Sequence, residues 1–413
     1  MTELIENREI REKLILVAVQ TEGVEDVDLS LDELAELVRT AGAETAGRIV
    51  QNRGAVHPGT YIGKGKIDEV REMLRETDAT GIVCDDELSP AQMKNLEDML
   101  DTKVLDRTVV ILDIFASRAV TKEGRIQVEL AQARYALTRL SGFGKSMSRL
   151  GGGIGTRGPG ETKLETDRRR IRSRISSLKA DLQEIEKRRG VNRTLREKNR
   201  MPVVAIVGYT NAGKSTLLNR LTEAGVLSEN KLFATLDPTT RNLKLPAGQE
   251  VLLTDTVGFI RKLPHHLIDA FRSTLEEAKY ADIIVHVVDA SNENWGIQAD
   301  VVYETLSNLG VGGKPVITLF NKCDLLSGNS AFFRDPRAER CILTSMVTGE
   351  GIEAFLSETG RLLNEGKTYV CRTFAFSEAG KVQRIRKYGQ LLEEAYTEEG
   401  IFVRAYVPKD LKL

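Results

Sequence analysis

The chain has 413 residues, of which 41% are hydrophobic and 29% charged, as expected for a folded protein with more than one domain. Its first residues are charged and no apolar run approaches the ~20 residues that a membrane span needs, so we expect neither a secretory signal nor an integral membrane protein. The four cysteines form no CxxC pair and do not cluster with the four histidines, which argues against disulfides and zinc and fits a reducing cytoplasm.

The net charge of −1 conceals a strong asymmetry along the chain. Residues 134–200 carry 19 Lys and Arg against 7 Asp and Glu, an excess of +12, so the remaining residues carry −13. Such a segment is either the solvated face of helices or the electrostatic footprint of a nucleic-acid binder.

Residues 1–108 are predicted to form a small α/β subdomain. Helical patterns separate successive apolar runs, and this alternation is typical of a parallel sheet. The GKGK sequence at 63–66 lacks the spacing of a phosphate loop, and we interpret it as a turn. The predicted strands are 14–20, 45–51, 81–85 and 103–106, and the predicted helices are 31–40, one from near Ile67, and 90–100.

Residues 109–200 are predicted to be mainly helical. Apolar residues repeat at heptad spacing between 126 and 140 and again between 164 and 185, and each apolar stripe is too narrow to be buried all round. We therefore expect an antiparallel helical hairpin. The basic residues 187–200 lack periodicity and are interpreted as a linker.

The loop between these helices, residues 141–161, is rich in glycine. GFGKS lacks the first glycine of a phosphate loop because Arg139 stands there, and the GxGxxG match at 153–158 follows a helix instead of a strand. Glycine permits close backbone approach and arginine pairs with phosphate, so we interpret the loop as a contact for structured RNA. Its cationic residues are Lys145, Arg149 and Arg157.

The stretch VVAIVGYTNAGKST, residues 203–216, predicts a buried strand at 203–207, a loop with the spacing GxxxxGK[ST], and a helix from Thr216. Such a loop turns backbone N–H groups toward phosphate oxygens at a helix N-terminus. We expect Lys214 to reach the outer phosphates and the Ser215 hydroxyl to bind Mg²⁺. The loop residues predicted to bind the nucleotide are Gly208, Tyr209, Thr210, Asn211, Ala212, Gly213, Lys214, Ser215 and Thr216.

Three later motifs predict GTP and GDP as ligands. The strand 251–254 ends in Asp255, Thr256, Val257 and Gly258, where the aspartate can hold Mg²⁺ through a water and the Gly258 N–H can sense the γ-phosphate. The strand 316–320 ends in Asn321, Lys322, Cys323 and Asp324. The carboxylate of Asp324 can accept both the N1–H and the N2–H of guanine, which adenine cannot offer, while the stem of Lys322 covers the base. A strand at 341–343 ends in Thr344, Ser345 and Met346, placed to touch the base from its other side.

The segment LFATLDPTTRNLKL lies between the phosphate loop and Asp255. A threonine there should bind Mg²⁺ only when the γ-phosphate is present, which makes this loop a switch. Thr235, Thr239 and Thr240 are the alternatives for that role.

Two residues bear on hydrolysis. Phe259 stands where many GTPases carry a water-orienting glutamine, and because phenylalanine cannot polarise water we expect slow intrinsic turnover. The side-chain carbonyl of Asn211 either coordinates K⁺ beside the phosphates or caps the loop. The predicted catalytic residues are Lys214, Thr235, Gly258 and Asn211.

Residues 367–413 are predicted to form a βαβ-like appendage. Apolar and polar residues alternate at 369–376 and 401–407, and a helical pattern at 381–396 lies between them. It exposes the basic residues Lys381, Arg384, Arg386 and Lys387, and its role is not readable from the sequence.

The predicted fold class is α/β, with a P-loop GTPase domain as its centre. The predicted domains are an N-terminal α/β subdomain (1–108), a long antiparallel helical hairpin with a glycine-rich basic loop and linker (109–200), the GTPase domain (201–366) and a small C-terminal α+β appendage (367–413).

Six sequence motifs together resemble those of a known family. They are YIGKGK (61–66), GGGIGTRGPGE (151–161), GYTNAGKST (208–216), FATLDPTTR (233–241), DTVGFI (255–260) and NKCD (321–324). Through them the chain resembles the HflX family of ribosome-associated GTPases over nearly its whole length. The resemblance implies a GTPase that binds the large ribosomal subunit and its RNA and splits stalled or idle ribosomes under stress.

The resemblance also implies that Ser215 and Thr235 are Mg²⁺ ligands beside Asp255, and that the hairpin loop reaches ribosomal RNA. It places the switch residues Phe233, Ala234, Thr235, Leu236 and Asp237 at the nucleotide. The chain departs from the family where Thr344-Ser345-Met346 replaces the more usual Ser-Ala-x, which leaves the contacts of Met346 open.

We expect a cytoplasmic monomer that does not bind DNA and is not an integral membrane protein. A GTPase partner in ribosome assembly or tRNA modification is the alternative function, and a non-catalytic RNA-binding adaptor that holds GTP as a structural ligand is a third.

Overall fold

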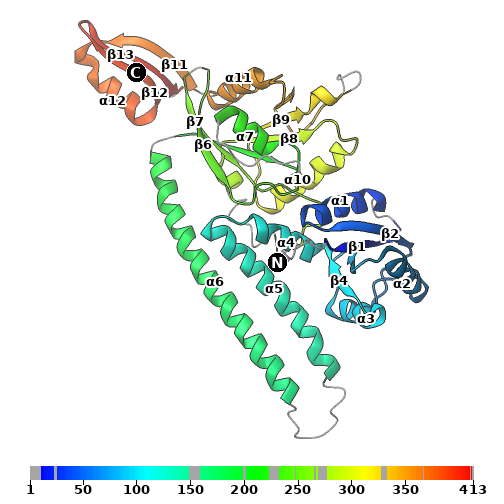
Figure 1. The fold of residues 1–413 in the computed structure, drawn as a ribbon. Helices are drawn as coiled ribbons and strands as arrows, with labels where there is room; N and C mark the ends of the chain where they lie inside the picture. The colour runs from blue at the N-terminus through cyan, green and yellow to red at the C-terminus, as the bar shows by residue number, and fades with distance from the viewer. Residues whose placement is uncertain are drawn as a thin grey trace, which may run out of the picture. The chain divides into compact units, whose positions relative to one another are not determined.

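The computed structural model describes residues 11–22, 26–147, 159–198, 201–222, 232–246, 248–264, 267, 277–326, 333–365, 367–409 and 411 (Figure 1). These residues divide into two compact units. The first unit comprises 1–187, 229–237 and 261–272, and the second comprises 188–228, 238–260 and 273–413. In the part of the chain so described, no helix is long and apolar enough to cross a membrane.

The first unit contains a four-stranded parallel sheet in the order β2-β1-β3-β4, which confirms the predicted α/β pattern. The central strand β1 is buried along most of its length, because helices cover parallel sheets on both faces. Helix α3 starts at a capping box between Ser89 and Gln92. The elements are β1 (Lys13–Gln20), α1 (Val27–Thr40), β2 (Glu44–Asn52), α2 (Lys64–Thr77), β3 (Gly81–Cys84), α3 (Pro90–Leu100) and β4 (Lys103–Asp106).

The GKGK sequence was interpreted as a turn, but only Gly63 lies outside a helix. It is the N-cap of α2, and the helix begins at Lys64. The expected start near Ile67 is therefore three residues late, because lysine is a good helix former and one glycine does not prevent the first turn.

Among its described residues the first unit also contains α4 (Arg107–Arg118), α5 (Lys122–Met147) and most of α6 (Pro159–Lys198). The α5 and α6 helices lie side by side and pack through the predicted apolar stripes (Figure 1). Ile126 and Leu130 of α5 bury Leu178 of α6, and Arg174 binds Glu129 through two hydrogen bonds of 2.6 and 2.8 Å.

Two sequence predictions in this region are wrong. The segment 187–198 was expected to be a linker, yet it continues α6, because Lys, Arg, Glu and Leu favour a helix even when no apolar stripe is present. The loop expected at 141–161 is shorter, since α5 extends to Met147 and α6 begins at Pro159. Lys145 therefore lies in α5, while Arg149 and Arg157 lie outside the described residues.

The second unit contains a six-stranded sheet in the order β10-β9-β8-β5-β7-β6. All neighbours are parallel except β6 and β7, which form an antiparallel hairpin. Helix α7 begins at Lys214, two residues before the predicted start. The elements are β5 (Val203–Gly208), α7 (Lys214–Thr222), β6 (Thr239–Lys244), β7 (Glu250–Asp255), β8 (Ile283–Asp289), α10 (Trp295–Asn308), β9 (Val316–Asn321), β10 (Arg340–Leu343) and α11 (Ile352–Leu363).

The C-terminal residues form an antiparallel sheet in the order β11-β13-β12, backed by α12. The helix expected at 381–396 is wrong in its second half, because α12 ends at Tyr388 and 390–397 form a strand. Gly389 ends the helix where a Cβ would lie 2.9 Å from the carbonyl oxygens of Ile385 and Tyr406. The elements are β11 (Lys367–Phe374), α12 (Ala379–Tyr388), β12 (Gln390–Thr397) and β13 (Gly400–Pro408).

Candidate nucleotide site

The phosphate loop connects β5 to α7 and depends on two glycines. Gly208 has a φ of +153°, and a Cβ there would lie 2.2 Å from the carbonyl oxygen of Val287. Gly213 has a φ of +103°, and a Cβ there would lie 2.2 Å from Nδ2 of Asn321. Asn211 between them is left-handed at +61°, a conformation that asparagine tolerates better than most residues. The loop is therefore held in the shape that phosphate binding needs.

Lys214 is the first residue of α7, and its side chain is only 6% exposed. Its ammonium donates a hydrogen bond of 2.7 Å to the carbonyl oxygen of Tyr209. Burial lowers the pKa of Lys214 to about 8. A buried cation beside a helix N-terminus is stabilised by an anionic ligand such as a phosphate.

Two of the three residues predicted to hold Mg²⁺, Ser215 and Asp255, lie close together in the second unit, whereas Thr235 belongs to the first. The Ser215 hydroxyl donates a hydrogen bond of 2.9 Å to Oδ2 of Asp255, whose side chain is fully buried. Mg²⁺ prefers oxygen ligands and keeps several waters, so this hydroxyl and carboxylate fit the ion together with phosphate oxygens. Among the described residues, no group of three or more His, Cys, Asp and Glu could hold a metal ion.

The loop from Asp255 to Gly258 lies against the phosphate loop. A Cβ on Gly258 would lie 2.9 Å from Cγ2 of Thr210 and 3.1 Å from Nζ of Lys214. Thr256 and Val257 are buried, and the Thr256 hydroxyl donates to the carbonyl oxygen of Ile206 at 2.7 Å. The backbone of Gly258 is therefore close to Lys214, whose side chain is expected to hold the outer phosphates.

The backbone of Phe259 also forms hydrogen bonds with the phosphate loop. Its carbonyl oxygen accepts from the Thr210 N–H at 2.8 Å, and its own N–H donates to the Gly208 carbonyl oxygen at 3.1 Å. The ring is 2% exposed. The position where a glutamine could orient water therefore carries a buried hydrocarbon ring.

Asn321 joins three of the predicted segments. Its Nδ2 donates to the carbonyl oxygen of Ala212 at 2.8 Å, and its Oδ1 accepts from the Met346 N–H at 3.1 Å. The Cys323 N–H donates to the carbonyl oxygen of Thr344 at 3.1 Å. Thr344, Ser345 and Met346 are all at most 3% exposed, so buried groups join the phosphate loop to the two segments predicted to bind the base.

Lys322 and Asp324 flank the expected position of guanine. Lys322 has a φ of +65°, and its ammonium lies 2.6 Å from Oδ2 of Asp289. Asp324 lies in a short 3-10 helix (Cys323–Leu325) with its side chain exposed. Asp289 was not among the residues predicted from the sequence, although it lies at the carboxyl end of a buried strand, as the predicted motif residues do.

The predicted switch residues belong to the first unit. The Phe233 ring lies 4.7 Å from the Phe115 ring in an edge-to-face arrangement, and Leu236 is buried. The carboxylate of Asp237 accepts hydrogen bonds from the N–H groups of Val120 and Thr121 at 3.0 and 2.9 Å, and from the Thr121 hydroxyl at 2.5 Å. Ala234 and Thr235 lie within this anchored segment.

The other two threonine candidates lie in strand β6. The hydroxyl groups of Thr240 and Thr254 are 3.0 Å apart, and Thr239 pairs with Asp255 in the ladder between β6 and β7. These threonines therefore belong to the sheet of the second unit.

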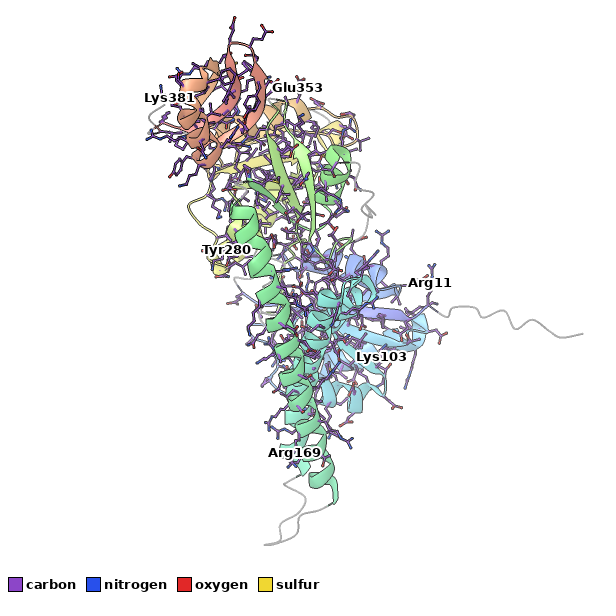
Figure 2. The ribbon with its side chains drawn as sticks, turned by 90° about the vertical axis from the view of Figure 1, so that its left-hand side faces the viewer. Arg11, Lys103, Arg169, Tyr280, Glu353 and Lys381 are labelled. Atoms are coloured by element: carbon purple, nitrogen blue, oxygen red, sulfur yellow. The ribbon has the colours of Figure 1, made fainter. Side chains whose placement is uncertain are left out.

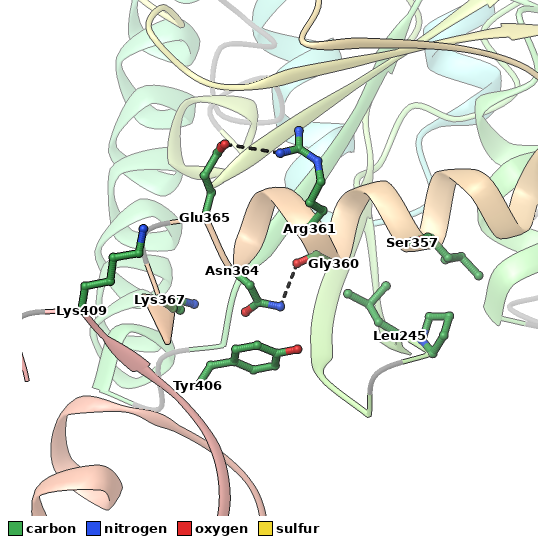
Figure 3. A pocket seen from close by; sticks show the side chains of 11 residues that line it. Leu245, Ser357, Gly360, Arg361, Asn364, Glu365, Lys367, Tyr406 and Lys409 are labelled. Carbon is green, nitrogen blue, oxygen red and sulfur yellow. Dashed lines mark hydrogen bonds and ion pairs between the residues drawn. The ribbon is translucent and has the colours of Figure 1, made fainter. Parts of the chain in front are cut away.

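A separate cleft of about 520 Å³ lies between α11 and the C-terminal sheet (Figure 3). Asn364 in its wall donates to the carbonyl oxygen of Gly360 at 2.8 Å. None of the predicted nucleotide-binding residues lines it, so the cleft is distinct from the site. Its lining is Leu245, Pro246, Leu356, Ser357, Gly360, Arg361, Asn364, Glu365, Lys367, Tyr406 and Lys409.

The sheet order, the phosphate loop after β5, the aspartate at the end of β7 and the NKCD sequence at the end of β9 together define a P-loop GTPase. Three protein families match successive parts of the chain. Residues 28–116 match the family described as GTP-binding GTPase N-terminal, 118–196 the GTP-binding GTPase Middle Region, and 203–322 the 50S ribosome-binding GTPase.

Similar proteins are named GTPase HflX. The one from Lacrimispora saccharolytica is 63% identical over 411 residues, covering 100% of this chain and 97% of the relative. The one from Escherichia coli K12 is 42% identical, covering 87% and 85%. Among solved structures, the complex of SsGBP with GDP has a TM-score of 0.46 at 26% identity and covers 85% of this chain and 98% of that chain.

The chain therefore belongs to the HflX family of GTPases, as the sequence resemblance predicted. It is a ribosome-associated enzyme that binds GTP and GDP and hydrolyses GTP.

Proposed function

We propose that the protein binds the large ribosomal subunit in its GTP form and separates the subunits of stalled or idle ribosomes under stress. It acts in the cytoplasm as a monomer and contacts ribosomal RNA, with no role for DNA or a membrane. The observation that supports this proposal is an exposed cationic helix in a chain whose residues 203–322 match a 50S ribosome-binding GTPase family.

The cations of α6 are arranged for contact with a polyanion. Arg169, labelled in Figure 2, is exposed on α6. Arg172 is also exposed and lies three residues further on, so the two share one face of the helix. Arg170 is also exposed, at 4.0 Å from Asp167. Arg174 instead binds Glu129 of α5, so it holds the hairpin together. The arginines closer to the start of α6 are available to pair with phosphate oxygens.

The residues of the nucleotide site support a GTPase whose hydrolysis of GTP is activated by the ribosome. Lys214 and the loop N–H groups bind the phosphates, Ser215 and Thr235 bind Mg²⁺ directly, Asp255 holds the ion through a water, and Gly258 senses the γ-phosphate. Because Phe259 supplies no polar group, the water must be oriented by another group, and the ribosome is the source that we propose. K⁺ beside Asn211 would add positive charge where the transition state becomes more negative.

The test measures GTP hydrolysis by the full chain alone, with 50S subunits and with 70S ribosomes, and follows 70S dissociation by light scattering. We expect a low basal rate, strong stimulation by the particles, and dissociation with GTP but not with GDP. The Arg169→Glu/Arg172→Glu variant should lose stimulation and keep the basal rate. Arg75→Glu, an exposed arginine of α2, is the matched control and should behave as wild type.

A rate that does not change when ribosomes are added would contradict the proposal. Co-sedimentation with precursor particles, and not with mature subunits, would favour the alternative role in ribosome assembly.

A further inference from the structure

Arg220 of α7 binds the loop that follows the Thr344-Ser345-Met346 motif. Its Nη1 donates to the carbonyl oxygens of Met346 and Val347 at 2.9 and 3.0 Å, and its Nη2 donates to that of Thr348 at 3.2 Å. One guanidinium thus holds three consecutive carbonyl groups of a segment about 126 residues away in the sequence. Hydrogen bonds from a charged donor are stronger than those from a neutral one.

The loop is shaped to accept this arginine. Gly349 has a φ of +94°, and a Cβ there would lie 2.3 Å from Nη2 of Arg220. Val347 is 77% exposed, so apolar packing does not hold this end of the loop in place. Inside the loop, Ser345 accepts from the N–H groups of Thr348 and Gly349, at 3.1 Å on its hydroxyl and 2.8 Å on its carbonyl oxygen. The guanidinium therefore holds residues 346–348, the end of the turn that follows Thr344 and Ser345.

Arg220 also belongs to the helix that binds the phosphates. It lies six residues after Lys214, on a helix of nine residues that starts at the phosphate loop. Asn321 links the same two regions from the buried side, through Ala212 and Met346. The loop is thus attached to the phosphate-binding segment at two points.

We propose that Arg220 is a positioning residue for guanine recognition: it fixes the loop from Thr344 to Thr348 relative to the phosphate-binding helix, so that base and phosphates are bound in one geometry. This inference rests on the proposed placement of Thr344, Ser345 and Met346 at the base.

Arg220 and Asp324 affect the recognition of different groups of guanine. The carboxylate of Asp324 accepts hydrogen bonds from the base and so recognises N1–H and N2–H. The O6 atom of guanine is an acceptor that requires an N–H donor, and the proposed placement of the loop at the base assigns that donor to its main chain. A loop displaced by loss of Arg220 should therefore weaken recognition of O6 and leave recognition of the N2 amino group unchanged.

The experiment measures dissociation constants of the full chain for three ligands by calorimetry. They are GDP, 6-thioguanosine diphosphate, in which a poor acceptor replaces O6, and inosine diphosphate, which lacks the N2 amino group. Wild type should prefer GDP to both analogues. Arg220→Ala should bind GDP about tenfold more weakly. Its preference for GDP over the thio analogue should shrink toward one, while its preference over inosine diphosphate stays at the wild-type value.

Two further variants complete the test. Arg220→Lys keeps one cationic donor and should restore part of the preference for O6. Arg361→Ala removes an exposed arginine of α11 that binds Glu358 and Glu365, and should match wild type. Thermal unfolding checks that each variant is folded.

The outcomes are distinct. An Arg220→Ala variant that keeps the full preference for GDP over the thio analogue overturns the inference, and so does one that loses both preferences equally. If wild type itself does not distinguish O6 from sulfur, the proposed base contact of the 344–346 segment is wrong, and this inference falls with it. Loss of the O6 preference alone supports it.

Discussion

The ammonium of Lys262 lies 2.8 Å from the carboxylate of Asp86 and also contacts the neighbouring carboxylate of Asp85. Both acidic residues follow strand β3 in the first unit, and Lys262 lies four residues after Gly258 in the sequence. Asp85 is fully buried and also binds Ser30 at 2.7 Å and Arg107 at 3.0 Å. The segment that contains Lys262 is thus anchored by charge to the carboxyl end of β3, an interior strand of the N-terminal sheet.

Removal of this anchor is expected to destabilise the first unit. Lys262→Met leaves a buried carboxylate with one cation fewer, which should lower the free energy of unfolding by about 1–3 kcal/mol. Hydrogen exchange at residues 261–264 should become faster. Lys103→Met is the matched control, because Lys103 pairs with Glu12 at the surface and should cost less than about 1 kcal/mol. Equal effects of the two substitutions would contradict the prediction.

The second unit should lose stability in mild acid because of His286. This side chain is 1% exposed, its ring lies edge-to-face 5.1 Å from that of Tyr303, and burial lowers its pKa below the ordinary value of about 6.5. Between the lowered pKa and about pH 6.5 the unfolded chain binds more protons than the folded chain. The free energy of unfolding should therefore fall as the pH drops below about 6.5.

Chemical denaturation at a series of pH values between about 7.5 and 5 tests this prediction, because that range spans the ordinary pKa of histidine. His286→Phe keeps an aromatic ring and removes the titrating group, so its stability should change less over the same range. A wild-type curve as flat as that of the variant would show that His286 does not contribute.

Asp324→Asn should change the base preference of the nucleotide site. The variant loses the charged acceptor for N1–H and N2–H, so GDP should bind about 100-fold more weakly. Xanthosine diphosphate has a carbonyl group where guanine has N2–H, and the new amide can donate to it, so this ligand should gain affinity. Asp289→Asn is the control: it disturbs the partner of Lys322 and should weaken both ligands alike. Unchanged preference for GDP in Asp324→Asn would exclude the predicted base contact.

Turnover should depend on the monovalent cation if Asn211 coordinates K⁺. With ribosomes present, replacing K⁺ by Na⁺ should lower the rate in wild type. Asn211→Gly tolerates the φ of +61° and removes the side-chain carbonyl, so its rate should be the same in both salts. Asn211→Asp keeps an oxygen at that position and should retain the dependence. Equal wild-type rates in the two salts would end the cation hypothesis and leave Asn211 as a cap of the loop.

Several errors of the sequence analysis share a physical cause. Residues 187–198 were expected to be a linker because they have no apolar stripe, but a long charged helix needs none once its neighbouring turns are already formed. Residues 390–396 were predicted to continue a helix from 381, but they form a strand because they pair with β13 in an antiparallel ladder. The pattern of apolar residues predicts secondary structure least well in segments that bury few side chains.

The sequence alone was enough to predict the strands and loops that we expect to bind the nucleotide. A phosphate loop, an aspartate at a strand end and an NKCD sequence each depend on neighbouring residues, so their spacing is readable without a fold. The tertiary structure decided which distant side chains hold these motifs in place: Arg220 on the loop after Met346, Asp289 on Lys322, and Asp86 on Lys262. Such contacts join residues 33 to 176 positions apart, and no local periodicity records them, because they arise only when the folded core brings those segments together.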